Sequence, residues 1–207
     1  MNDAMIVGLF WGGLFIRAIV ALFNHSGEGK PPMYGDFEAQ RHWMEITTNL
    51  PVGEWYQNGP LNDLQYWGLD YPPLTAYVSY IFGAVAQVLL PDLVEISFSR
   101  GYETTLGKIF MRTSVILCDS FIYIPAVIMG SVSMINKLQS TWNLSDSNFM
   151  HRLVCFFQGY MKKPILSTQV ENGMMLMATC LVVHPGLLLI DHGHFQYNGV
   201  GIGLALM

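Results

Sequence analysis

Residues 35–51 read GDFEAQRHWMEITTNLP, and residues 64–73 read LQYWGLDYPP. Both stretches lie in a polar segment, rich in acidic and aromatic residues, between the apolar runs 4–23 and 74–90. Residues 24 to 72 include seven acids and two bases, so this segment alone accounts for the net charge of −5. The pattern predicts a folded polar loop held at a membrane surface by the apolar runs on either side.

The composition of the chain points to an integral membrane protein. Of 207 residues, 52% are hydrophobic and 12% are charged, about half of the roughly 25% charged residues that is usual for soluble domains. No basic tract suggests nucleic acid as a partner. The three cysteines, Cys118, Cys155 and Cys180, are scattered and form neither a disulfide framework nor a metal-ligand cluster. We therefore expect no metal and no cofactor.

Apolar runs along the chain predict an all-α, multispan bundle. A helix of twenty residues covers the roughly 30 Å hydrocarbon core of a bilayer. The first run lacks a basic region before it and a cleavage site after it, so we expect an uncleaved anchor. The last run is too short to cross, which predicts that the chain ends inside a helix. The expected spans are residues 4–23, 74–90, 113–135 and 174–190, with an incomplete one at 199–207.

Two charged residues lie within these spans. Arg17 either extends its guanidinium to the nearer headgroups or points inward at an anion, and the sequence leaves both readings open. Asp119 lies seven residues into the third span, where an acid normally faces the bundle interior and has a partner. Arg112, one heptad earlier, is the expected partner in a structural ion pair, and a functional role for Asp119 is the alternative.

Residues 36–50 are predicted to form an amphipathic helix. Its apolar side chains recur with helical spacing, and Pro51 marks its end. Such a helix suits the membrane–water interface, with Trp43 at the depth of the headgroups. The apolar face holds Ala39, Trp43, Ile46 and Leu50, and the polar face holds Glu38, Arg41, His42 and Glu45.

The basic residues only partly determine the sidedness. The loop 24–72 has two of them and the loop 91–112 has three, so the second is the better cytosolic candidate. That choice places the N-terminus in the cytosol and the acidic loop on the other side. Counting onward places the four-base loop 136–173 on the non-cytosolic side, against the same rule. The side of residues 191–198 stays open.

The polar segments contain groups that suit a glycosyl transfer without a metal. This chemistry needs a general base for the attacking hydroxyl and cations or donors for the departing phosphate. The candidate bases are Asp36, Glu38 and Asp70, and the candidate phosphate contacts are Arg17, Arg41, His42, His192 and His194. Asp36 and Asp70 could instead cap helices. Trp67 and Tyr71 suit a sugar site and a bilayer interface equally well.

Several strings resemble the endoplasmic-reticulum dolichyl-phosphate-glucose α-1,3-glucosyltransferases. The fit is better to the branch that adds the first glucose to the dolichol-linked high-mannose oligosaccharide. The resemblance covers about residues 29–135 and 181–198. The strings are GKPPMYGDFEAQRHWMEITTNLP (29–51), LQYWGLDYPPLTAY (64–77), SRGYE (99–103), KIFMRTSVIL (108–117) and LIDHGHFQYN (189–198).

The resemblance implies a GT-C fold, a multispan helical bundle of the endoplasmic-reticulum membrane with its active site at the luminal face. It implies transfer from dolichyl phosphate glucose to the dolichol-linked oligosaccharide, with inversion and without a metal. Asp36 would be the general base and Asp70 a secondary acid. The residues expected to bind substrate are Arg17, Glu38, Arg41, His42, Trp67, Tyr71, His192, His194 and Gln196.

Two departures keep other readings open. The family is much longer than this chain, and nothing in residues 136–173 resembles it. The alternative is a non-catalytic membrane protein that binds lipid-linked glycan or related glycosyltransferases. A transporter would show inverted repeats with paired broken helices, and the sequence contains no visible repeat.

Overall fold

The structure is a computed structural model that describes residues 3–145 and 163–207, and the described residues contain helices but no β-strand. The all-α prediction is confirmed. The main helices are α1 (Asp3–Val20), α2 (Gly35–Asn49), α3 (Pro73–Leu89), α4 (Thr105–Cys118), α5 (Ile124–Ser145), α7 (Lys163–Val182) and α9 (Asn198–Leu206). Short turns are η1 (Val52–Glu54), η2 (Pro91–Leu93) and α8 (Pro185–Leu187), and two segments are π-helical, η3 (Asp119–Tyr123) and η4 (Leu188–Phe195).

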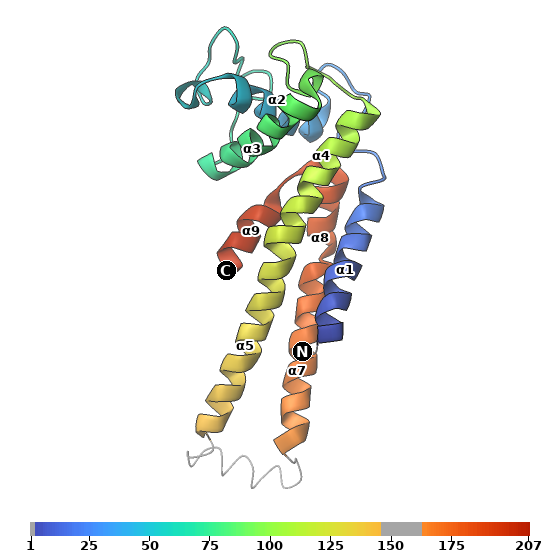
Figure 1. Cartoon of the computed structure of the whole chain (residues 1–207), viewed down its shortest axis with the longest axis vertical. Helices are drawn as coiled ribbons and strands as arrows, with labels where there is room; N and C mark the ends of the chain where they lie inside the picture. Colours follow the sequence, from blue (N-terminus) through green and yellow to red (C-terminus); the bar gives the residue numbers. More distant parts are fainter. Residues whose placement is uncertain (1–2, 146–162) are drawn as a thin grey trace.

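The molecule consists of a bundle of long helices with a smaller layer at one end. The segments α4, η3 and α5 form one continuous helix, and α7 runs beside it with α1 next to α7 (Figure 1). Buried apolar side chains from these helices, including Leu9, Ile124, Val127 and Val182, form the core of the bundle. The helices α2 and α3 lie together at the end of the bundle where α4 begins (Figure 1).

Two described helices are long and apolar enough to cross a membrane, Thr105–Met134 and Met175–Phe195, while Ala4–Val20 and Pro73–Leu89 are shorter apolar helices. The first of the long pair begins earlier than the predicted 113, because Thr104 caps it: its Oγ1 accepts a hydrogen bond from the amide of Gly107 at 3.0 Å. The fourth predicted run continues as helix to Phe195, past the expected end at 190.

The helix α3 differs in position from the predicted span at 74–90. It packs on α2 in the end layer instead of running beside the long helices (Figure 1). Small side chains line its buried face, namely Ala76, Ser79, Gly83 and Ala86. A Cβ on Gly83 would lie 2.1 Å from Thr48 Oγ1 and 2.8 Å from the Met44 carbonyl oxygen, so the two helices touch backbone to backbone. This placement in the end layer does not support a span beside the long helices, and a membrane crossing by 74–90 stays a prediction.

The predicted helix at 36–50 is confirmed as α2, but the expected contact of Trp43 with lipid headgroups is wrong. Nearly every residue from Phe37 to Thr47 is buried, on the polar face as well as the apolar one. Trp43 is 4% exposed, and its Nε1 donates a hydrogen bond to the carbonyl of Trp67 at 2.9 Å. The loop around Trp67 and the helix α3 cover the face that we expected to meet lipid headgroups.

The loop after α3 lies at the same end of the molecule as α2. Arg41 donates a hydrogen bond to the carbonyl of Leu93 at 2.9 Å, and Lys108 Nζ lies 3.1 Å from Glu28 Oε1. The end of α5 and the start of α7 lie at the opposite end (Figure 1). The expectation that the loop 91–112 faces away from the acidic loop is thus wrong. If α3 does not cross the membrane, the count of spans places the loop 136–173 on the cytosolic side, which agrees with its four basic residues.

Candidate functional site

The start of α2 is fixed by a tight approach of two loop segments. Gly35 has φ +68°, and a Cβ there would lie 2.6 Å from the Ser26 carbonyl oxygen, so this position requires glycine. Ser26 also links two distant parts of the chain: its Oγ accepts from the Asp36 amide at 3.4 Å, and its own amide donates to the His194 carbonyl at 3.2 Å. The local fold therefore brings Asp36 to the segment that follows the last long helix.

Asp36 contacts two of the residues that we predicted separately for substrate binding. His194 Nδ1 lies 2.8 Å from Asp36 Oδ2, and Gln196 Nε2 donates to the same oxygen at 2.9 Å. The side chains of Asp36 and His194 are 30% and 55% exposed, so a ligand can reach both. The N-cap of α2 is Tyr34, without a side-chain cap bond. The capping alternative for Asp36 is therefore wrong.

The orientation of the Gln196 amide is set by a further chain of hydrogen bonds. Its Oε1 accepts from Asn198 Nδ2 at 2.9 Å, which leaves Nε2 to donate to Asp36. Asn198 Nδ2 also donates to Asp191 Oδ1 at 2.9 Å, and Asp191 Oδ2 accepts from the amide of Gly199 at 2.8 Å. Asp191 and Asn198 escaped our prediction. Their place in the DHGHFQYN string was the signal that could have found them.

Three carboxylates act electrostatically on the hydroxyl of Tyr71. The pKa of Tyr71 is raised, first by partial burial and then by the negative charges of Asp70, Asp36 and Asp191. Asp70 is exposed and makes no cap on α3, whose N-cap is Pro72 without a side-chain bond. Its predicted capping role is therefore wrong. That Tyr71 and Asp70 belong to the same site as Asp36 stays a prediction.

The predicted phosphate contact Arg41 instead belongs to a buried network on the polar face of α2. Its guanidinium bonds both oxygens of Glu38, at 2.7 and 2.8 Å, and Glu45 Oε2 at 2.8 Å. His42 Nδ1 lies 3.0 Å from the same Glu45 oxygen. Exposure of Glu38, Arg41, His42 and Glu45 is at most 1%. As placed, the first three of these cannot face a substrate, because α2 is covered on this side too.

This network fastens α2 to the loop that follows α3. Glu45 Oε1 accepts from the amide of Ser97 at 2.8 Å, and Ser99 Oγ donates to Oε2 at 3.0 Å. Burial by itself would raise the pKa of Glu45, but the hydrogen bond with His42 and the charge of Arg41 outweigh it and lower the pKa to about 2. Tyr66 extends the network, since its hydroxyl donates to Glu38 at 2.8 Å.

Arg17 points inward at an anion, and that anion is Asp119. Arg17 Nε donates to Asp119 Oδ2, and His192 Nε2 lies 2.9 Å from the same oxygen. All three side chains are at most 1% exposed. Arg112, the partner expected for Asp119, donates instead to the carbonyls of His192 and Gly193. The expected Arg112–Asp119 ion pair is wrong, and Arg17 and His192 are enclosed where we expected them to meet substrate.

His192 contacts Asp119 inside the bundle, whereas His194 contacts Asp36 at the exposed site. The two imidazoles therefore do not contact the same group. Trp67 is tied to the loop, since its Nε1 donates to the carbonyl of Met33 at 2.6 Å. Among the described residues, no group of three or more histidine, cysteine or acidic side chains could hold a metal ion.

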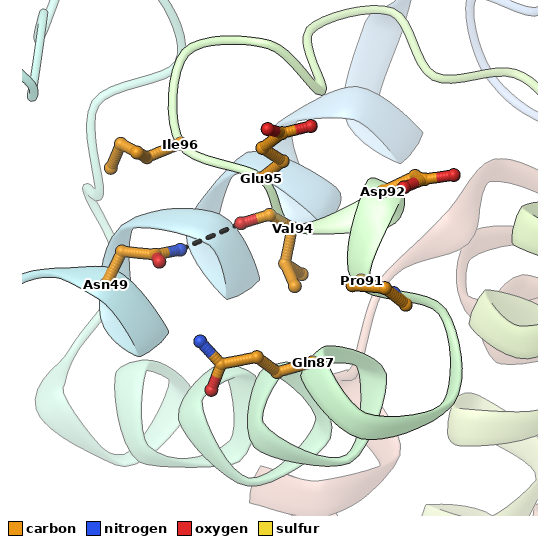
Figure 2. A pocket seen from close by; sticks show the side chains of 7 residues that line it. All are labelled: Asn49, Gln87, Pro91, Asp92, Val94, Glu95 and Ile96. Carbon is orange, nitrogen blue, oxygen red and sulfur yellow. Dashed lines mark hydrogen bonds between the residues drawn. The ribbon is translucent and has the colours of Figure 1, made fainter.

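A separate pocket of ≈ 330 Å³ lies at the far end of α2 (Figure 2). Asn49, at that end, donates from Nδ2 to the carbonyl of Val94 at 2.8 Å and so ties α2 to the turn after α3 (Figure 2). The residues that line the pocket are Asn49, Gln87, Pro91, Asp92, Val94, Glu95 and Ile96. None of the predicted site residues is among them, so the candidate site remains the region around Asp36.

The described residues thus combine two helices long and apolar enough to cross a membrane with a partly exposed carboxylate at one end of the bundle. The family model of the ALG6, ALG8 glycosyltransferase family matches residues 13–207. The chain belongs to this family of membrane glycosyltransferases. The match includes residues 136–173, which we expected to be unlike the family; of these, 146–162 lie outside the described residues.

Curated relatives agree with the family assignment. The chain is 48% identical over 193 residues to the dolichyl pyrophosphate Man9GlcNAc2 alpha-1,3-glucosyltransferase of Gallus gallus, which covers 93% of the chain and 32% of the relative. It is 47% identical over 194 residues to the protein of that name in Rattus norvegicus, covering 94% and 32%. It is 44% identical over 206 residues to a probable one in Dictyostelium discoideum, covering 100% and 34%. The chain spans about a third of their length.

Proposed function

We propose that the protein transfers glucose from dolichyl phosphate glucose to the dolichol-linked high-mannose oligosaccharide, with inversion and with Asp36 as the general base. One observation carries the proposal: a partly exposed carboxylate held through one oxygen by His194 and Gln196. Oδ1 accepts no hydrogen bond among the described residues, so it is available to a sugar hydroxyl. A base must lie within hydrogen-bond reach of the proton that it removes, and the exposure of Asp36 supports this role.

In the proposed reaction, the acceptor hydroxyl oxygen bonds to the anomeric carbon of glucose while its proton passes to Asp36. The bond from that carbon to the phosphate oxygen breaks, and dolichyl phosphate leaves with the electron pair. Attack opposite the leaving group inverts the anomeric centre. Of the candidate phosphate contacts, His194 is the one that lies exposed beside Asp36. Tyr71 and Asp70 would line the acceptor side.

We further propose that the protein is a multi-pass component of the endoplasmic-reticulum membrane, with a GT-C bundle and with α2 on the luminal side. The two long apolar helices and the family assignment support this. The basic residues Lys137, Arg152, Lys162 and Lys163 then lie between two spans on the cytosolic side, as positively charged loops usually do.

A second candidate is a non-catalytic membrane protein that binds lipid-linked glycan or related glycosyltransferases.

A glucosylation assay with synthetic donor and acceptor lipids separates the two. We expect the wild-type protein to transfer glucose. We expect Asp36→Asn to lower the transfer rate about 10²–10⁴-fold, the usual contribution of a general base. The matched control is Glu54→Gln, an exposed acid in the same loop, which should keep the wild-type rate. Glycan binding without turnover by well-folded wild-type protein would favour the second candidate.

A further inference from the structure

The segment that carries His194 and Gln196 is held from the bundle side by a buried charged cluster of Arg17, Asp119 and His192. Asp119 Oδ2 is bonded to Arg17 Nε and lies 2.9 Å from His192 Nε2. An ionised carboxylate can only accept hydrogen bonds, so His192 donates through Nε2. His192 thus lies two residues from His194 and points into the bundle, while His194 points to Asp36.

The cluster joins elements that are distant in sequence. Arg17 comes from α1, Asp119 begins η3 and His192 lies in η4. Arg17 Nη1 also donates to the carbonyl of Val182 at 2.8 Å, near the end of α7. Through Arg17 and His192, this one carboxylate therefore links the 188–195 segment to α1, to η3 and to the end of α7.

The geometry around this carboxylate leaves little freedom. A Cβ on Gly199 would lie 2.2 Å from Asp119 Oδ1, so the start of α9 packs directly against it. Both Asp119 and His192 belong to π-helical segments. Such segments are rare and occur frequently at functional sites.

Stability alone does not account for a charged cluster here. Apolar residues of similar volume usually serve as well or better than a buried ion pair. Among the residues that the structure describes, Arg17 Nη2, Asp119 Oδ1 and His192 Nδ1 are also buried without a hydrogen-bond partner. Buried polar atoms without a partner reduce stability. Their presence here therefore suggests that the cluster positions other residues of the protein.

We propose that Asp119 and His192 are positioning residues of the glucosyl-transfer site. Asp119, oriented by Arg17, holds His192, and His192 fixes the backbone from which His194 and Gln196 reach Asp36. The inference rests on the proposed function. The inference makes a specific requirement: an N–H donor at the position of His192 Nε2 must reach Asp119.

Two substitutions of similar size test this requirement in the full-length protein. His192→Gln keeps an N–H donor near the Nε2 position, whereas the shorter side chain of His192→Asn places its donor near the Nδ1 position. We expect the rate per folded molecule to stay within about threefold of wild type for His192→Gln. We expect it to fall about 10²-fold for His192→Asn, the typical loss for a misplacement of about 1 Å. The size of the unfolding transition on thermal melting in detergent measures the amount of folded protein for each variant.

A double-mutant cycle separates positioning from a general structural defect. In a His194→Ala, Gln196→Ala background the groups that His192 positions are absent, so adding His192→Asn should change the residual rate less than twofold. A merely structural role would lower both backgrounds by the same factor. Equal losses for His192→Gln and His192→Asn would also overturn the inference.

The Asp36→Asn variant distinguishes the two levels of the proposal. If Asp36→Asn is as active as wild type, the proposed function fails and the positioning role fails with it. If Asp36→Asn is inactive but the cycle is additive, the positioning role alone is overturned.

Discussion

Hydrogen bonds to one oxygen of Asp36 give this carboxylate a defined direction. Gln196 contributes an amide whose own oxygen is occupied by Asn198, so its NH₂ group must face the carboxylate. The strings in the sequence identified these residues as candidates. They could not show that Asp36 and His194, separated by 158 positions, are in contact. This contact depends on how the long helices between the two residues pack against each other.

Reversing the polarity of the Gln196 contact should impair the reaction. Gln196→Glu replaces an N–H donor by an oxygen, so two carboxylates would face each other. We expect the transfer rate at pH 7 to fall by at least about tenfold, within the usual cost of disturbing a general base. The measurement is the initial rate of glucosylation per folded molecule. Gln65→Glu, at an exposed position of the loop between α2 and α3, is the control and should leave the rate unchanged.

The residues Glu38, Arg41 and His42 show where residue-scale prediction failed. Their spacing correctly placed them on one face of a helix, yet spacing cannot tell whether that face meets water, substrate or protein. Here the loop after α3 covers it, and the charges neutralise one another inside the protein.

The buried carboxylate of Glu45 predicts how stability depends on pH. A carboxylate whose pKa is about 2 in the folded state stabilises the fold above its unfolded value of 4.5, and the effect is lost as the pH falls from about 5 to 2. Glu45→Gln should cost about 3 kcal/mol of unfolding free energy at pH 7 and much less near pH 2. Denaturant titrations in detergent at both pH values measure this. An equal cost at the two values, or a loss as large for the exposed Glu95→Gln, contradicts it.

Among the elements, α3 shows what hydropathy can and cannot say. Its existence and bounds were predictable, since Pro73–Leu89 differs from the expected 74–90 by one residue at each end. Its place in the end layer was not, because an apolar helix that crosses a membrane and one that lies across the end of a bundle have the same composition. The recurrence of small residues from Ala76 to Ala86 was the available signal for close helix packing.

The contact of α3 with α2 should be sensitive to a single methyl group. Gly83→Ala places a Cβ too close to the backbone of Met44, so the helices must separate, at a cost of about 1–3 kcal/mol. Gly12→Ala is the matched control, because a Cβ there meets nothing within 4 Å and should be neutral or stabilising. Unfolding in detergent measures both. A neutral Gly83→Ala would show that α3 does not pack on α2 as described.

At the scale of the whole molecule, the position of α3 decides the topology. If α3 does not cross the bilayer, residues 24–104 and 191–198 share one side, and the contact between Asp36 and His194 requires the same. Counting every apolar run as a span contradicted the distribution of basic residues. The contradiction disappears when one run is removed, so charge distribution held information that hydropathy alone did not.

Two single substitutions test this topology by creating glycosylation acceptors on either side of α3. Pro60→Ser produces the sequon Asn-Gly-Ser at 58–60, and Glu95→Asn produces Asn-Ile-Ser at 95–97, both at exposed positions. If α3 stays on the luminal side, both variants should gain a glycan in microsomes that an endoglycosidase removes. Modification of Pro60→Ser alone would mean that α3 crosses the membrane. Modification of neither, with a glycan at the native sequon Asn143-Leu144-Ser145 and none at the other native sequon Asn24-His25-Ser26, would mean that the whole molecule is inverted.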